Sequence, residues 1–126
     1  MSIQILVVDD HEAHRYAMGK ILQNAGYEVI LAKDGEEALD LASQHAPQVV
    51  LLDINMPGIN GYQVCRQIKS DERTKHAAVI FHTGTEATSI ARSQAESVGA
   101  SAFLTYPIST DHLLSVVEGA AARFRK

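Results

Sequence analysis

Short apolar runs alternate with longer amphipathic segments along this chain of 126 residues. Residues 3–8, 49–52 and 77–81 are almost entirely apolar, and most of them are rich in β-branched side chains. That pattern is typical of strands buried on both faces of a parallel sheet. Residues 27–31 and 101–105 are more mixed, as strands at the edge of a sheet often are. The pattern therefore predicts five strands, two of them at the edges.

A segment with helical periodicity follows each predicted strand. Apolar side chains recur at helical spacing within residues 13–25, 38–42, 64–68, 90–98 and 113–124. Gly26 and Gly99 are expected to end the first and fourth helices. Asp34 and Glu37 have the spacing of a capping box for the second helix, and the third is expected to open near Asn60.

This order of elements, a strand and then a helix five times over, predicts right-handed crossovers and a parallel sheet with helices on both faces. Five such units suit an α/β fold: a three-layer, doubly wound, flavodoxin-like (βα)5 domain with strand order 2-1-3-4-5. The length fits one domain over residues 1–126, and the sequence contains no internal repeat or low-complexity stretch.

Composition narrows the class of protein. The net charge of −4 has the wrong sign for a domain that grips a nucleic-acid backbone. Cys65 is the only cysteine, which excludes an intramolecular disulfide and fits a reducing compartment. The N-terminus lacks the features of a secretory signal, and the longest apolar runs are far shorter than the roughly 20 residues of a membrane helix. We expect a cytoplasmic domain without direct nucleic-acid binding or membrane insertion.

Candidate chemistry lies where the predicted strands end. Ligands of open parallel sheets bind beyond the carboxyl ends of the strands. Asp9 and Asp10 follow the first strand, Asp53 follows the third, and Thr83 and Gly84 follow the fourth. Clustered carboxylates repel one another unless a cation lies among them, and Mg²⁺ prefers oxygen ligands. A carboxylate can also attack phosphorus and form an aspartyl phosphate, with a hydroxyl and backbone N–H groups holding the phosphoryl oxygens.

A structural interpretation of the same acids stays open. Aspartate at the end of a strand commonly forms a turn or caps a helix. On that interpretation Asp10 caps the first helix, and Asp53 opens the turn over residues 54–58.

Four stretches of the chain, taken together, resemble the receiver domain of bacterial two-component response regulators. They are residues 5–10, 50–61, 83–84 and 99–103. The resemblance covers essentially the whole chain. Each stretch is weak evidence alone, whereas their order and spacing are highly specific.

The resemblance implies a site and its chemistry. Asp53 would accept a phosphoryl group from a histidine kinase or a phosphotransfer protein. Asp9 and Asp10 would hold Mg²⁺ together with Asp53 and the backbone carbonyl of Asn55. Thr83 would bind the phosphoryl group.

The resemblance also implies a response. Thr83 would draw the following loop inward, and the aromatic ring of Phe103 would turn inward with it. A downstream protein would then bind the face made by the fourth helix, the fifth strand and the fifth helix.

One position departs from the family pattern. Receiver domains carry a lysine at the end of the fifth strand before a proline, whereas this chain has Tyr106 before Pro107. A charge-assisted bond from lysine contributes roughly 1.5–3 kcal/mol, against about 0.5–1.5 kcal/mol for a neutral one. Tyr106 therefore leaves metal binding and phosphate uptake permitted but puts the conformational response in question. The resemblance further implies a cis peptide bond before Pro107.

Two alternatives remain beside a phosphoacceptor receiver. Tyr106 favours a pseudo-receiver, an interaction module that works without phosphorylation. A phosphatase with an aspartate nucleophile would carry a second acid two residues later, where this chain has Asn55.

The chain is either a stand-alone receiver or a domain excised from a larger signalling protein. His11 and His14 invite a zinc interpretation, but with no evident third ligand we expect both to face solvent.

Overall fold

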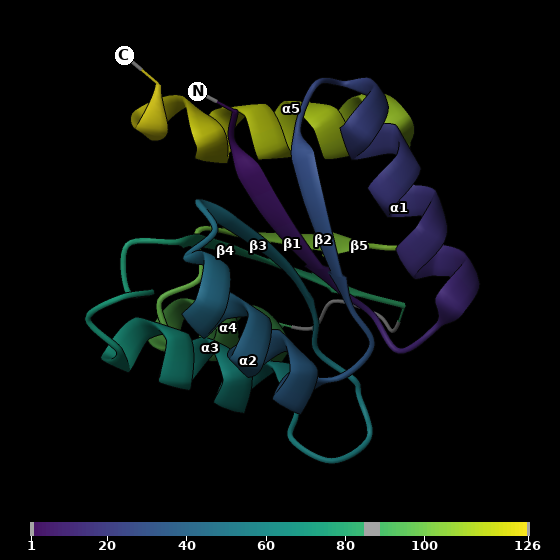
Figure 1. Ribbon diagram of the computed structural model, residues 1–126. Coiled ribbons are helices and arrows are strands. Elements are labelled where there is room, and N and C mark those ends of the chain that lie inside the picture. Colours follow the sequence, from purple (N-terminus) through teal and green to yellow (C-terminus); the bar gives the residue numbers. More distant parts are fainter. Residues whose placement is uncertain (1, 85–88, 126) are drawn as a thin grey trace.

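The computed structural model describes residues 2–84 and 89–125, in which strands and helices alternate from the first strand to the last helix (Figure 1). The strands are β1 (Gln4–Val8), β2 (Glu28–Ala32), β3 (Val49–Asp53), β4 (Ala78–Thr83) and β5 (Ala102–Thr105). The helices are α1 (Glu12–Asn24), α2 (Gly35–His45), α3 (Gly61–Ser70), α4 (Ser89–Ser97) and α5 (Thr110–Ala121), and a short 3₁₀ turn, η1, covers Ala122–Phe124. Within the described residues, no helix is long and apolar enough to cross a bilayer.

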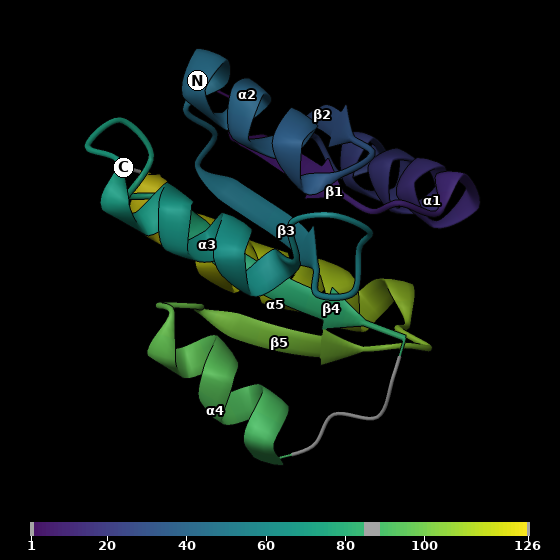
Figure 2. The same cartoon turned by 90° about the horizontal axis from the view of Figure 1, so that it is seen from below.

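The five strands form one parallel sheet in the order β2-β1-β3-β4-β5, which confirms the expected topology. Helices α1 and α5 lie on one face, and α2, α3 and α4 lie on the other (Figures 1 and 2). In register, Val8 of β1 lies beside Leu52 of β3, and Asp53 lies beside His82 of β4. The residues that follow β1 therefore meet the end of β3 at the carboxyl edge of the sheet.

Burial explains why the central strands are so apolar in sequence. Every residue of β3 and β4 is buried, whereas β2 and β5 lie at the edges and are only partly covered. Alternate side chains of each strand enter two separate clusters, because successive residues point to opposite faces. One cluster packs under α2 and α3, and the other packs under α1 and α5.

Capping side chains fix where α2 and α3 begin. Asn60 accepts a hydrogen bond from the N–H of Gln63, whose side chain in turn accepts one from the N–H of Asn60, so α3 starts with a complete capping box. Asp34 caps α2 by accepting from the N–H of Glu37. The predicted box there is only half right, because the Glu37 carboxylate accepts from the N–H of Lys33 instead.

Gly61 brings the start of α3 against the end of β3. A Cβ atom at this position would lie 2.4 Å from the carbonyl oxygen of Asp53 and 2.8 Å from the Cα of Ile54. Only glycine permits this approach. The close contact holds the turn between β3 and α3, and with it the backbone of Asp53, at the edge of the sheet.

Candidate functional site

The three predicted acids meet at the carboxyl edge of the sheet. One ligand oxygen from each of Asp9, Asp10 and Asp53, and one nitrogen of His11, all lie within 4.8 Å of one another. Asp9 is 1% exposed and Asp53 is 7% exposed, although both are acids. Buried carboxylates are rare unless a partner compensates the charge. We name the three side chains the acidic rim.

Local hydrogen bonds orient two of these carboxylates. Asp53 accepts from the N–H of Asn55 at 3.1 Å, and Asp9 accepts from the N–H of His11 at 2.8 Å. The turn-forming interpretation is therefore correct for Asp53, without removing it from the acidic rim. It is wrong for Asp10, because His11 is the N-cap of α1 and no side chain caps that helix.

Asp10 has an unusual oxygen. Its Oδ1 atom is buried and accepts no hydrogen bond within the described residues. The nearest basic atom is Nδ1 of His11, at 3.3 Å. An oxygen withdrawn from water without a donor costs free energy, and a cation among the carboxylates would offset that cost.

The electrostatics of the acidic rim point the same way. Burial raises the pKa of Asp53 from 3.8 to about 7. The hydrogen bond from the N–H of Asn55 opposes that shift, whereas the charges of Asp9 and Asp10 add to it. A hard divalent cation would reverse the balance by favouring the ionised form. The donor set, three carboxylates beside the backbone of Asn55, fits Mg²⁺.

Thr83 lies at the end of β4, next in space to the end of β3. It is 2% exposed, and its hydroxyl accepts a hydrogen bond from the side-chain amide of Asn55 at 3.2 Å. Because Asp53 is in register with His82, Thr83 is one residue beyond the level of Asp53. This placement brings a hydroxyl to the same edge of the sheet, as the sequence predicts.

Tyr106 points into this edge. Its hydroxyl lies 2.9 Å from Nδ1 of His82 and 3.3 Å from Oδ2 of Asp9. Burial raises the pKa of Tyr106, and the charges of Asp9 and Asp53 raise it further, so the hydroxyl keeps its proton. The peptide bond between Tyr106 and Pro107 is cis, as expected.

His82 is a site residue that sequence reasoning missed. Its ring is fully buried, with Nε2 at 3.2 Å from the carbonyl oxygen of Val8. Burial lowers the pKa of His82, so the ring is neutral, and Nε2 donates to that carbonyl while Nδ1 accepts from Tyr106. The sequence did contain a signal for His82: it is a histidine in an otherwise apolar strand, and a buried polar ring needs hydrogen-bond partners.

Phe103 lies away from the acidic rim, on β5. Its ring is partly buried against the cluster under α2 and α3, and the guanidinium of Arg92 on α4 lies over it at 5.0 Å from the centroid. The ring is thus in contact with both α4 and the core.

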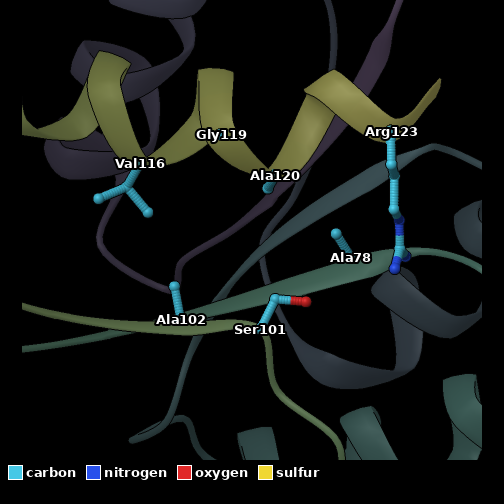
Figure 3. Close-up of a pocket in the computed structure, with 7 residues that line it drawn as sticks. All are labelled: Ala78, Ser101, Ala102, Val116, Gly119, Ala120 and Arg123. Carbon is cyan, nitrogen blue, oxygen red and sulfur yellow. The ribbon is translucent and has the colours of Figure 1, made fainter. Parts of the chain in front are cut away.

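A pocket elsewhere in the molecule lacks comparable chemistry. Figure 3 shows it at the opposite edge of the sheet, between α5 and the first residues of β4 and β5. It is lined by Ala78, Ser101, Ala102, Val116, Gly119, Ala120 and Arg123. Its lining contains one serine and one arginine but no acid or histidine, so this pocket has no counterpart of the acidic rim.

Known proteins of similar sequence include response regulators. The chain is 44% identical over 108 residues to the response regulator PleD of Caulobacter vibrioides, covering 86% of this chain and 24% of that protein. It is 35% identical to protein PilH of Pseudomonas aeruginosa, with 94% of this chain and 98% of PilH covered. The chain thus spans about a quarter of PleD but nearly all of PilH.

Solved structures give the same result. The chemotaxis protein CheY4 of Vibrio cholerae superposes with a TM-score of 0.91 at 29% identity, covering 95% of this chain and 99% of that one. The BeF3-activated DrrB receiver domain superposes with a TM-score of 0.86 at 29% identity, covering 98% of this chain and all of that one. The family model for the response regulator receiver domain matches residues 5–118. The chain therefore belongs to the response regulator receiver domains of two-component signal transduction, a family of signalling domains rather than enzymes.

Proposed function

We propose that this receiver domain accepts a phosphoryl group on Asp53 with the help of Mg²⁺. The observation that carries the proposal is the acidic rim, where three carboxylates converge within 4.8 Å and one buried oxygen of Asp10 lacks a donor. A fold gains nothing in stability from such a cluster. A site that must bind a cation and then a phosphoryl group needs it.

The proposed step is a displacement at phosphorus. An oxygen of the Asp53 carboxylate forms a bond to phosphorus, while the bond between phosphorus and the donor breaks and the leaving group takes the electron pair. Asp53 must be ionised for this step, and its pKa of about 7 without a cation makes it half protonated near neutral pH. Mg²⁺, held by Asp9, Asp10, Asp53 and the Asn55 carbonyl, would favour the ionised form and neutralise phosphoryl oxygens.

Residues of the chain would then hold the product. Thr83 can donate its hydroxyl proton to a phosphoryl oxygen, and it would then exchange its present bond with Asn55 for that contact. Movement of Thr83 would propagate through the adjacent strand to Phe103 and Arg92. We propose the face formed by α4, β5 and α5 as the surface that a downstream protein reads. The phosphodonor would be a histidine kinase or a phosphotransfer protein.

Intact mass tests the proposal directly. The protein is incubated with a small acyl phosphate and Mg²⁺, beside the Asp53→Asn variant and a sample with chelator. We expect a gain of one phosphoryl group only in the wild-type sample with Mg²⁺. A gain of equal size in Asp53→Asn would place the acceptor elsewhere and contradict the proposal.

A pseudo-receiver is the second candidate, and one observation favours it. The hydroxyl of Tyr106 lies against His82 and Asp9, so the position from which a lysine would contact the phosphoryl group is filled by a neutral donor. We expect Tyr106→Lys to strengthen the coupling between phosphate and conformation. If this variant changes neither the lifetime of the phosphorylated state nor its structure, the missing lysine does not explain how this chain signals.

A further inference from the structure

We propose that Asp9, His11 and His14 form a binding site for a transition-metal ion such as Zn²⁺, beside the acidic rim and sharing only Asp9 with the Mg²⁺ ligands. One ligand atom from each of the three residues lies within 4.8 Å of the other two. His11 and His14 were expected to lack a third ligand. The structure corrects that expectation, because Asp9 supplies one from the end of β1.

The separations are at or slightly above those around a tetrahedral ion. Nδ1 of His11 lies 3.6 Å from Oδ1 of Asp9, and Nδ1 of His14 lies 3.8 Å from Oδ2 of Asp9. Zinc binds imidazole and carboxylate at about 2.0–2.2 Å, so neighbouring ligand atoms of a tetrahedral site lie roughly 3.3–3.6 Å apart. The two distances end at different oxygens of Asp9, so the exposed imidazoles must rotate for both nitrogens to reach one ion. The fourth position would be open to water.

The three ligands are held by different parts of the structure. His11 is the N-cap of α1 and His14 lies in its first turn, three residues on, so both rings face the same side of the helix. The ring of His14 stacks on Tyr106 at 4.9 Å, and its side chain is 51% exposed. Asp9 is oriented by the N–H of His11, which donates to its Oδ1 at 2.8 Å. Side-chain exposure of 69% for His11 keeps its nitrogen accessible to an ion from solvent.

The charges around this cluster favour a cation. Asp10 adds a second carboxylate at 3.3 Å from Nδ1 of His11. The nearby guanidinium of Arg15 donates to the backbone carbonyl of Asp9 at 2.8 Å, so it is not paired with the carboxylate. An N₂O ligand set selects zinc-like ions over Mg²⁺, because Mg²⁺ prefers oxygen ligands and imidazole suits Zn²⁺, Co²⁺ and Ni²⁺.

Sharing Asp9 has a consequence that rests on the proposed function. An ion held by His11 and His14 would engage the carboxylate that Mg²⁺ also needs. Zn²⁺ would then slow phosphoryl uptake by Asp53. Binding itself can be measured without any phosphodonor, so failure of one proposal is distinguishable from failure of the other.

Calorimetric titration of the full chain with Zn²⁺, in buffer free of Mg²⁺, tests the site. We expect His14→Gln to weaken Zn²⁺ binding by about tenfold or more, since even outer-shell partners of a metal contribute tenfold to a hundredfold. Asp53→Asn should bind Zn²⁺ within about twofold of wild type. His45→Gln, at the exposed end of α2, is the matched control for loss of a surface histidine and should have no effect. His14 is the decisive position, because His11 also lies within reach of the acidic rim.

Two results would overturn the proposal. Unchanged Zn²⁺ affinity in His14→Gln would show that the ion does not use this cluster. Weakened binding in Asp53→Asn together with normal binding in His14→Gln would place the ion among the carboxylates of the acidic rim instead. Circular dichroism of each variant checks that the fold is retained, which the exposure of His14 leads us to expect.

Discussion

The two edges of the sheet use charge in opposite ways. At the carboxyl edge, Asp9, Asp10 and Asp53 bring like charges together, and burial adds to the cost by raising the pKa of Asp53. At the amino edge, two cations donate to backbone carbonyls of the segment that leads into β4. Lys69 donates to Ala77 at 2.6 Å and to Lys75 at 3.3 Å, and Arg123 donates to His76 (Figure 3 shows Arg123 beside the start of β4).

The difference separates structure from function. At the amino edge, charged side chains satisfy carbonyls that would otherwise lack donors, so these residues stabilise the fold. At the carboxyl edge, Asp9 and Asp53 each accept from one backbone N–H, but the like charges of the acidic rim repel one another and destabilise the fold until a cation binds. Removing a charge should therefore raise the free energy of unfolding at the carboxyl edge and lower it at the amino edge. The following predictions test this difference.

The largest effect is expected for Asp53→Asn in the metal-free protein. The folded pKa of Asp53 is raised to about 7, so its contribution to stability is complete below the unfolded value of 3.8 and is lost as the pH rises through 7. The difference of roughly three units corresponds to at most about 4 kcal/mol. Asn resembles the protonated acid, so Asp53→Asn should stabilise the protein by up to that amount at pH 8.

Urea denaturation with chelator at pH 8 and pH 5 checks this prediction. The advantage of Asp53→Asn should be smaller at pH 5, where wild-type Asp53 is mostly protonated. Mg²⁺ at pH 8 should stabilise wild type more than the variant. An advantage of the same size at both pH values would show that ionisation of Asp53 is not its cause.

The next effect is expected at the amino edge, with the opposite sign. Lys69→Met keeps much of the aliphatic stem but removes the donor to the carbonyls of Lys75 and Ala77. Hydrogen bonds to charged groups contribute about 1.5–3 kcal/mol, so we expect a loss of that order in the free energy of unfolding. Arg66→Met, on the exposed side of the same helix, is the control and should change stability little. Equal losses in both variants would mean that helix propensity, rather than the carbonyl contacts, explains the effect.

A smaller effect is expected from Tyr106→Phe. The variant keeps the ring that stacks on His14 but removes the hydroxyl between His82 and Asp9. Nδ1 of His82 is then buried without its donor, and an unsatisfied buried group costs about 1–3 kcal/mol. We expect a loss near the lower end of this range. Thermal unfolding of Tyr106→Phe, of His82→Leu and of the double variant measures the coupling; additive losses would contradict a direct bond between the two residues.

The sequence predicts the fold well because burial dominates it. Apolar runs mark β1, β3 and β4, and the carboxyl ends of parallel strands must meet at one edge, so the convergence of Asp9, Asp10 and Asp53 follows from topology. Asn60 likewise marks the start of α3, since its capping box uses only neighbours in sequence. These features depend on local pattern and on a small number of topological rules.

Contacts between distant residues were not predictable in this way. The hydrogen bond between Tyr106 and His82 joins the residue after β5 to the second-last residue of β4. Asp9 can form a ligand set with His14 only because the first turn of α1 lies close to the end of β1. Both depend on side-chain rotamers and on local backbone direction rather than on periodicity. The interpretation of Asp10 as a helix cap is wrong because α1 begins at Glu12, so its N-cap is His11 rather than Asp10.

The smallest effect is expected at Arg123, which completes the comparison. Its guanidinium donates to the carbonyl of His76 from the surface, where water can replace it. It also lies over the ring of Phe124, at 4.8 Å from the centroid. Exposed interactions of this kind contribute about 0–1 kcal/mol, so Arg123→Met should lower stability by less than Lys69→Met does. Urea denaturation of both variants and of their combination tests the ranking. If Arg123→Met proved the more destabilising of the two, then the amino edge would depend on the covering turn after α5 rather than on the partly buried lysine of α3.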